Sequence, residues 1–153
     1  MIDLALARVL HVLAVVLWIG GVAMVTLVLL PNVLRDNGTP AQFEAIERRF
    51  AAQSRITVLL AGISGFYMVW KLDLWARFAA PRFWWMHAMV AVWALFSLLL
   101  YVLEPLWLHR WFDRRAATDP TATMRLIQRM HRLLLTLSLV TVAGAVAGSH
   151  GLI

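Results

Sequence analysis

The 153-residue chain contains no cysteine and few charged residues. Without cysteine it can form no disulfide, no thiolate zinc site and no cysteine-ligated iron–sulfur cluster. Charged residues make up 14% of the chain, against about 25% in an average soluble domain. The motifs GxSxG and HExxH and a phosphate-binding glycine loop are also missing. These absences exclude an ordinary cytosolic enzyme and give no support to nucleophilic catalysis.

Apolar residues are what the chain has in excess. They form 62% of the sequence, and a soluble domain of this length cannot bury so much apolar surface. This composition excludes disorder and collagen. The eight tryptophans are also numerous, and tryptophan gathers at membrane–water interfaces. The composition therefore predicts a small integral membrane protein with the lipid bilayer as its main partner.

Charge-free runs locate the membrane spans. Residues 9–34 form a run of 26, and residues 83–103 and 133–153 form runs of 21 each, whereas residues 56–70 form a run of only 15. About 20 apolar residues cross the hydrocarbon, so the shortest run is sufficient only if Arg55 and Lys71 snorkel to the interfaces. We therefore expect an all-α, up-down bundle of four transmembrane helices in a single domain, 1–153. Their expected ranges are 6–30, 50–72, 83–108 and 121–150.

Two of these helices are expected to extend into the cytoplasm. Thr39-Pro40 and Asp119-Pro120 are helix start signals, because proline is favoured at the first helical position. Of the 14 basic residues, ten lie in or beside the two loops that carry these signals, and four lie on the other side. By the positive-inside rule the ten-residue side is cytoplasmic. Both termini then face the periplasm of an inner membrane, and the basic residues indicate lipid contact with no nucleic acid partner.

Five histidines are the main candidates for chemistry. His11, His87 and His150 are expected at similar depth near the outer ends of three helices. Ionisable residues within spans are costly and usually functional. The three could ligate haem iron, bind a metal such as copper or zinc directly, or each bond to backbone or headgroups. Met68, Met86 and Met89 lie near the same level, and thioether sulfur favours copper(I).

The other two histidines, His109 and His131, are expected on the cytoplasmic side in contact with headgroups. Glu104, which precedes Pro105, is expected to be a charge at a helix end. Small residues, among them Gly144 and Gly148 in a GxxxG pattern, indicate close helix packing. His150 admits two interpretations, ligation of a metal or haem, and capping of its helix at the headgroups.

The chain also resembles a known family. Arg8-Val-Leu-His11 followed by Trp18-Ile-Gly20-Gly21 resembles the first helix of the HemJ family and of the copper-resistance-D-like membrane proteins. Phe43 to Phe50, with its Glu-Arg-Arg segment, resembles the residues ahead of their second helix, and His87 matches their third-helix histidine.

The resemblance implies a haem-b protein that oxidises protoporphyrinogen, or a protein of copper uptake and handling. It implies His11 as a haem ligand, with Trp18 and Gly21 in the cofactor-binding segment. The family has a lysine two residues after the third-helix histidine, where this chain has Met89. That departure leaves the oxidase activity, and whether the chain is an enzyme, open.

The sequence as a whole favours a membrane protein with one b-type haem near its outer face. It would act in electron transfer or in oxidation of a small lipophilic substrate, a quinol or a porphyrinogen. The first alternative is a copper-binding or copper-transport protein. The second is a cofactor-free structural subunit of a respiratory complex, and a homo-oligomer is also compatible with the sequence.

The first prediction concerns topology. A reporter that is active only in the periplasm, fused after Ile153, should be active, because the ten-to-four distribution of basic residues places both termini outside. Activity of a cytoplasm-specific reporter at the same position would contradict this. It would also move His11, His87 and His150 to the inner side.

Overall fold

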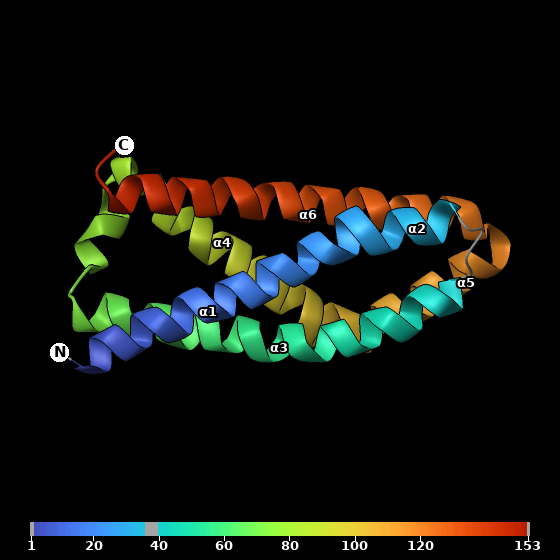
Figure 1. Cartoon of the computed structure of the whole chain (residues 1–153), viewed down its shortest axis with the longest axis horizontal. Coiled ribbons are helices and arrows are strands. Elements are labelled where there is room, and N and C mark those ends of the chain that lie inside the picture. The colour runs from blue at the N-terminus through green and yellow to red at the C-terminus, as the bar shows by residue number, and fades with distance from the viewer. Residues whose placement is uncertain (1, 36–39, 153) are drawn as a thin grey trace.

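The computed structural model describes residues 2–35 and 40–152. These residues are almost entirely helical and include no strand (Figure 1). The first stretch comprises α1 (Ile2–Met24), a short π-helix η1 (Val25–Leu29) and α2 (Leu30–Arg35). Next come α3 (Pro40–Lys71) and two 3₁₀ turns, η2 (Trp75–Ala79) and η3 (Pro81–Phe83). The third stretch is α4 (Trp84–Leu98), a longer π-helix η4 (Leu99–Leu108) and α5 (His109–Thr118), and the last helix is α6 (Pro120–Ser149).

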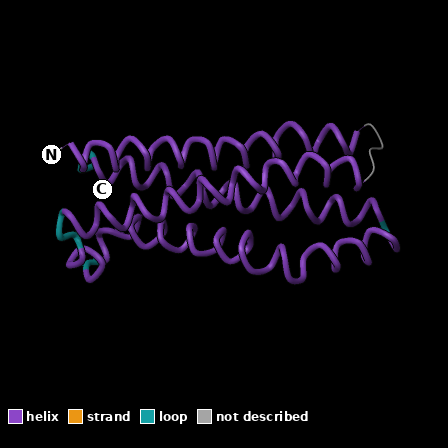
Figure 2. The backbone as a smooth tube through the Cα atoms, turned by 90° about the horizontal axis from the view of Figure 1, so that it is seen from below, coloured by secondary structure: helices purple, strands orange, loops and turns teal. Residues whose placement is uncertain are grey.

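The helices lie side by side along one long axis (Figures 1 and 2). α1, η1 and α2 lead away from the N-terminus, α3 returns, α4 to α5 lead away again, and α6 returns. Both termini therefore lie at one end of the molecule, together with η2 and η3. We call this the terminal end. The far end carries Arg35 and the junction between α5 and α6.

Among the residues that the structure describes, three helical stretches are long and apolar enough to cross a membrane. They are Ile2–Arg35, Pro81–Leu108 and Pro120–Ser149. Their apolar side chains point outward: Val16 on α1 is 60% exposed and Leu106 on η4 is 68% exposed. A soluble protein does not expose apolar surface on this scale, whereas lipid covers it. These three predicted spans are confirmed as far as length and composition go, and a fourth crossing by α3 stays a prediction.

The helix start signals are confirmed, and the first and third helical stretches run further than expected. α3 begins at Pro40, and the Asp119 carboxylate caps α6 by accepting a 2.9 Å hydrogen bond from the backbone N–H of Ala122. α1 to α2 continue to Arg35, beyond the expected end at residue 30. α5 and the two π-helical segments were not predicted. The side chains of Phe43 to Glu47 and of Arg49, which carry most of the Glu-Arg-Arg resemblance, lie outside the described residues, as does the Thr39 position.

One face of α3 is built from small residues at helical spacing. Ala51, Ser54, Val58, Ala61 and Ser64 recur every three or four positions, and all are buried. Small side chains let two backbones approach closely, and this face packs along α1. Buried apolar residues of α1, α3, α4 and α6 complete this part of the core.

Glycines on three helices provide hollows for aromatic rings. A Cβ atom added at Gly21 would overlap the ring of Phe50, one at Gly62 would overlap Trp93, and one at Gly148 would overlap Trp85. At Gly144 the added atom would lie 2.5 Å from the Trp84 ring. The GxxxG pattern of α6 therefore seats two α4 tryptophans. Trp85 is only 7% exposed, so it lies in the interface between helices and not at a membrane–water interface, where tryptophan usually gathers.

Neighbouring glycines in α1 give a matched test of this packing. Gly21→Ala should lower the free energy of unfolding by about 1–3 kcal/mol, because the added methyl group displaces the Phe50 ring. Gly20 has no atom within 4 Å of its ideal Cβ position, so Gly20→Ala should be neutral or stabilising by about 0.5–1 kcal/mol. Denaturant unfolding in detergent, followed by circular dichroism, measures both. Equal effects of the two substitutions would contradict the seating of the ring.

Candidate functional site

His11 is held against α3 by its ring and by a hydrogen bond. Its Cε1 lies 3.1 Å from where a Cβ of Gly65 would be, so only glycine leaves room for the ring. Nδ1 donates to the carbonyl oxygen of Ala61 at 2.9 Å, since a carbonyl can only accept. The neutral ring therefore carries its lone pair on Nε2, which makes no hydrogen bond to any residue that the structure describes. This is how proteins orient a metal-ligating imidazole.

The other two outer histidines differ in which nitrogen is engaged. His87 donates from Nε2 to the carbonyl oxygen of Phe78 at 3.0 Å, and its ring lies edge-on to the Phe78 ring. This bond ties α4 to η2 and engages Nε2, which is a common atom for metal ligation. His150 donates from Nδ1 to the carbonyl oxygen of Val146 at 2.9 Å, which leaves its lone pair on Nε2. Its backbone N–H also bonds to the last turn of α6, so this terminus is held without a ligand.

The three histidines do not form a preformed metal site. Among the described residues, no group of three histidine, aspartate or glutamate side chains is close enough to hold a metal ion. The hollow at Gly21 is filled by the Phe50 ring, so this glycine serves helix packing in the structure. Trp18 is buried edge-on against Phe96, with ring centroids 4.8 Å apart. Its Nε1 has no hydrogen-bond partner in the described part of the chain.

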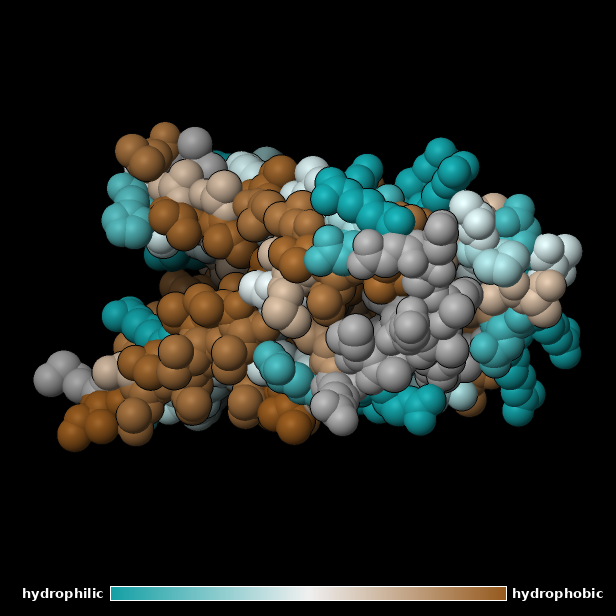
Figure 3. All heavy atoms as spheres, turned by 45° about the vertical axis from the view of Figure 1, so that its right-hand side comes forward, coloured by the Kyte–Doolittle hydropathy of each residue, from teal (hydrophilic) through white to brown (hydrophobic). Residues whose placement is uncertain are grey.

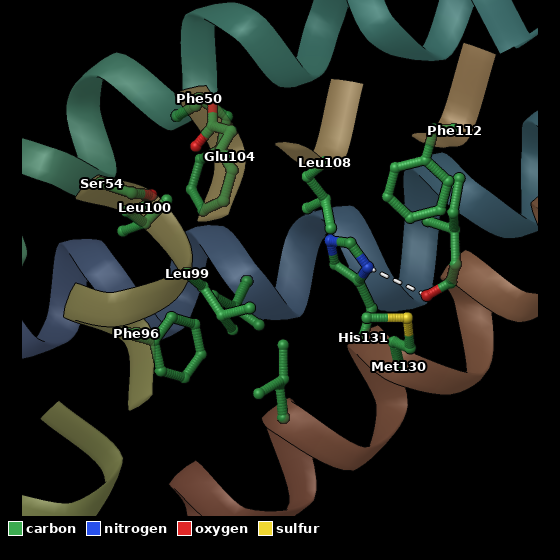
Figure 4. Close-up of a pocket in the computed structure, with 14 residues that line it drawn as sticks. Phe50, Ser54, Phe96, Leu99, Leu100, Glu104, Leu108, Phe112, Met130 and His131 are labelled. Carbon is green, nitrogen blue, oxygen red and sulfur yellow. Dashed lines mark hydrogen bonds between the residues drawn. The ribbon is translucent and has the colours of Figure 1, made fainter. Parts of the chain in front are cut away.

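A cavity of 110 Å³ lies away from these histidines, between α1, α3, η4 and α6 (Figure 4). Its lining is mostly aliphatic and aromatic, with three polar side chains, Ser54, Glu104 and His131. The sequence assigned Glu104 to a helix end and His131 to the headgroups. In the structure both line this cavity instead, with the His131 Nδ1 donating to the Ile127 carbonyl oxygen at 3.0 Å. The His109 side chain lies outside the described residues.

An ion pair lies beside the cavity, because its carboxylate belongs to the lining residue Glu104. Arg55 Nη2 lies 3.0 Å from Glu104 Oε1, and the Arg55 Nε donates to the Leu100 carbonyl oxygen at 3.2 Å. Tyr101 donates in turn to the Arg55 carbonyl oxygen. By the sequence, residues 56–70 are long enough to span only if Arg55 snorkels to the interface. Half-exposed as it is, Arg55 is bonded to η4 rather than extended to water.

Pro105 explains why η4 receives this arginine. In a π-helix the carbonyl of Leu100 is directed at the nitrogen five residues on, which belongs to Pro105 and carries no hydrogen. That acceptor needs a donor from elsewhere, and the Arg55 Nε supplies it. π-helical turns occur often at functional sites. The proline next to an acid was the sequence signal that could have drawn attention to this region.

Comparison with known proteins found no relative of this chain. No protein-family model, no curated protein and no solved structure matches the chain. The function therefore has to be argued from His11 and the other described side chains.

The Arg55–Glu104 pair predicts a measurable coupling. In a double-mutant cycle with Arg55→Met and Glu104→Gln, the two should be coupled by about 1 kcal/mol or more, because the pair is hydrogen-bonded and partly withdrawn from water. The exposed pair Lys71–Asp3, 3.3 Å apart, is the matched control and should show a clearly weaker coupling, because solvent screens it. Unfolding in detergent gives both values. A coupling for Arg55–Glu104 no larger than the control would contradict this structural role.

Proposed function

We propose that the chain is an inner-membrane protein that binds one b-type haem near its terminal end. All four long helical stretches would cross the bilayer, with both termini in the periplasm. The protein would act in electron transfer or in oxidation of a small lipophilic substrate, a quinol or a porphyrinogen. The observation that carries the proposal is the orientation of His11.

His11 has the features that a haem ligand requires. The Ala61 carbonyl fixes the proton on Nδ1, Gly65 makes room for the ring, and Nε2 keeps its lone pair. Trp18, two helical turns further on, has a buried indole N–H without a partner among the described residues. Buried indole groups usually find an acceptor, so Trp18 is a donor that a bound group can use. His11 would be the ligand, and burial around it would set the potential of the group.

The terminal end has space between its helices. α1 and α6 separate towards this end, and the space-filling view shows an apolar-walled recess there (Figures 1 and 3). Of the two other outer histidines, His150 fits a second ligand better than His87. His150 uses Nδ1 for its hydrogen bond to a backbone carbonyl and so keeps Nε2 for a ligand, whereas His87 uses Nε2 for its hydrogen bond to the Phe78 carbonyl oxygen.

Haem is favoured over a copper site by the number of ligands each needs. A haem iron takes one or two side-chain ligands, because the porphyrin supplies the others. A directly bound copper ion needs several converging donors. Separate histidines, each oriented by its own carbonyl, fit the first requirement better than the second. When bound, the haem supplies one-electron redox chemistry.

Polar contacts support a membrane crossing by α3. A charge within the hydrocarbon is costly unless it is paired, and Arg55 is paired with Glu104. At the terminal end, Lys71 pairs with Asp3, and Tyr67 donates to the same carboxylate. These contacts fasten α3 to α1 and to η4, both of which belong to stretches apolar enough to span. A helix fastened so at its middle and at its C-terminal end lies alongside those spans.

Substitution of the histidines tests the proposal. The purified protein should show a Soret band that shifts on reduction, and His11→Ala should lose at least nine-tenths of it, since the iron would lose its ligand. Deleting residues 150–153 should change the ligand class seen in the spectrum. His109→Ala, which lies in α5 at the far end, is the control and should keep the haem-to-protein ratio.

Three results would contradict this assignment. The first is a wild-type protein without haem after expression with excess haem precursor. The second is a His11→Ala protein with an unchanged spectrum. The third is loss of the spectrum in His87→Ala together with an unaffected deletion variant, which would make His87 the second ligand.

A further inference from the structure

The cavity between α1, α3, η4 and α6 has the lining of a site for a single ring. Its volume is 110 Å³, somewhat less than the roughly 150 Å³ of an apolar cavity known to admit benzene, so a ring fits once the lining gives way. Three phenylalanines, Phe50, Phe96 and Phe112, line it. Met130 lines it too, and its flexible side chain can yield to an occupant. Small-molecule sites are of this kind, mostly apolar with a few placed polar groups.

Ser54 supplies a polar group without a partner. The residue is 2% exposed, and its Oγ makes no hydrogen bond to any described residue. Other serines and threonines of these helices, such as Ser64 and Ser138, donate to the carbonyl four residues earlier. Ser54 instead lines the cavity, and its hydroxyl has no hydrogen-bond partner among the described residues (Figure 4). A buried hydroxyl without a partner is destabilising, and an acceptor on a bound molecule would recover that loss.

The cavity also lies within the apolar part of the molecule. Val22, Leu99 and Leu134, which line it, belong to the three stretches long and apolar enough to cross a membrane. Val22 is roughly 16 Å along α1 from His11, at 1.5 Å per residue. A ligand for this site must therefore be soluble in lipid, carry one ring, and present an oxygen acceptor.

We propose that this cavity binds the head group of a lipid-soluble quinone, with its ring among the phenylalanines and a carbonyl oxygen accepting from Ser54. This inference rests on the proposed function, because it names the electron partner of the haem. Glu104, paired with Arg55, and His131 form the polar wall of the site. Ordered water or a plain aromatic ring are the competing occupants.

Calorimetric titration of the purified protein in detergent with decyl-benzoquinone tests the site. The wild type should bind one equivalent saturably. Ser54→Ala should weaken binding about fivefold, the loss expected for one net hydrogen bond. Leu134→Trp, which fills the cavity, should abolish binding. Ser97→Ala is the matched control, since Ser97 also has a buried hydroxyl without a described partner but does not line the cavity.

Each competing occupant gives a distinct result that would overturn the proposal. Absence of saturable binding to the wild type leaves only water. Toluene that binds as tightly as the quinone, or equal affinities of Ser54→Ala and Ser97→Ala, shows that the oxygen is not recognised. Wild-type affinity in Leu134→Trp places the quinone elsewhere. A thermal unfolding transition verifies that each variant is folded. If Leu134→Trp is not folded, the comparison of the conservative Ser54→Ala with Ser97→Ala decides.

The haem content of the same preparations separates this inference from the proposed function. If the protein binds the quinone in a way that depends on Ser54 but shows no Soret band, the haem proposal is wrong and the quinone site stands. If the protein shows a normal Soret band but does not bind the quinone, the quinone site is wrong and the haem proposal stands.

Discussion

Lipid cannot hydrogen-bond to a polar side chain, so each one among the apolar helices needs a partner within the protein. In this chain the usual partner is a backbone carbonyl, and α3 provides most of the interhelical ones. His11 of α1 donates to Ala61, Trp93 of α4 donates to Val58, and Tyr101 of η4 donates to Arg55. These hydrogen bonds attach α3 to α1 and to the stretch of α4 and η4, and they take the place of hydrogen bonds to water.

This dependence explains the composition of α3. Neighbouring side chains reach its backbone only where its own side chains are small, which accounts for Ala61, Gly62 and Gly65 beside the rings of Trp93 and His11. Small and hydroxyl-bearing residues lower the apolar character of the helix, and Arg55 lowers it further. The helix that accepts most of these bonds is therefore also the least apolar of the four long helical stretches, and it is not among the three that are apolar enough to span.

Sequence reasoning predicted the features that depend on local chemistry. The starts of α3 at Pro40 and of α6 after Asp119 and the three strongly apolar stretches all follow from short-range signals. It did not predict the Arg55–Glu104 pair, whose partners lie 49 positions apart. Nor could it rank the outer histidines, because which nitrogen keeps its lone pair depends on carbonyls supplied by the fold.

The proposed crossing of α3 is measured most directly with single cysteines and a membrane-impermeant maleimide, since the chain has no cysteine of its own. Asp73 is exposed in the turn two residues after α3, Ile2 begins α1, and Arg35 ends α2. If α3 crosses, Asp73→Cys reacts from the same side as Ile2→Cys, and Arg35→Cys reacts only after the membrane is opened. Reaction of Asp73→Cys from the side of Arg35→Cys would show that α3 does not cross, and would contradict its role as the helix that binds the others within the bilayer.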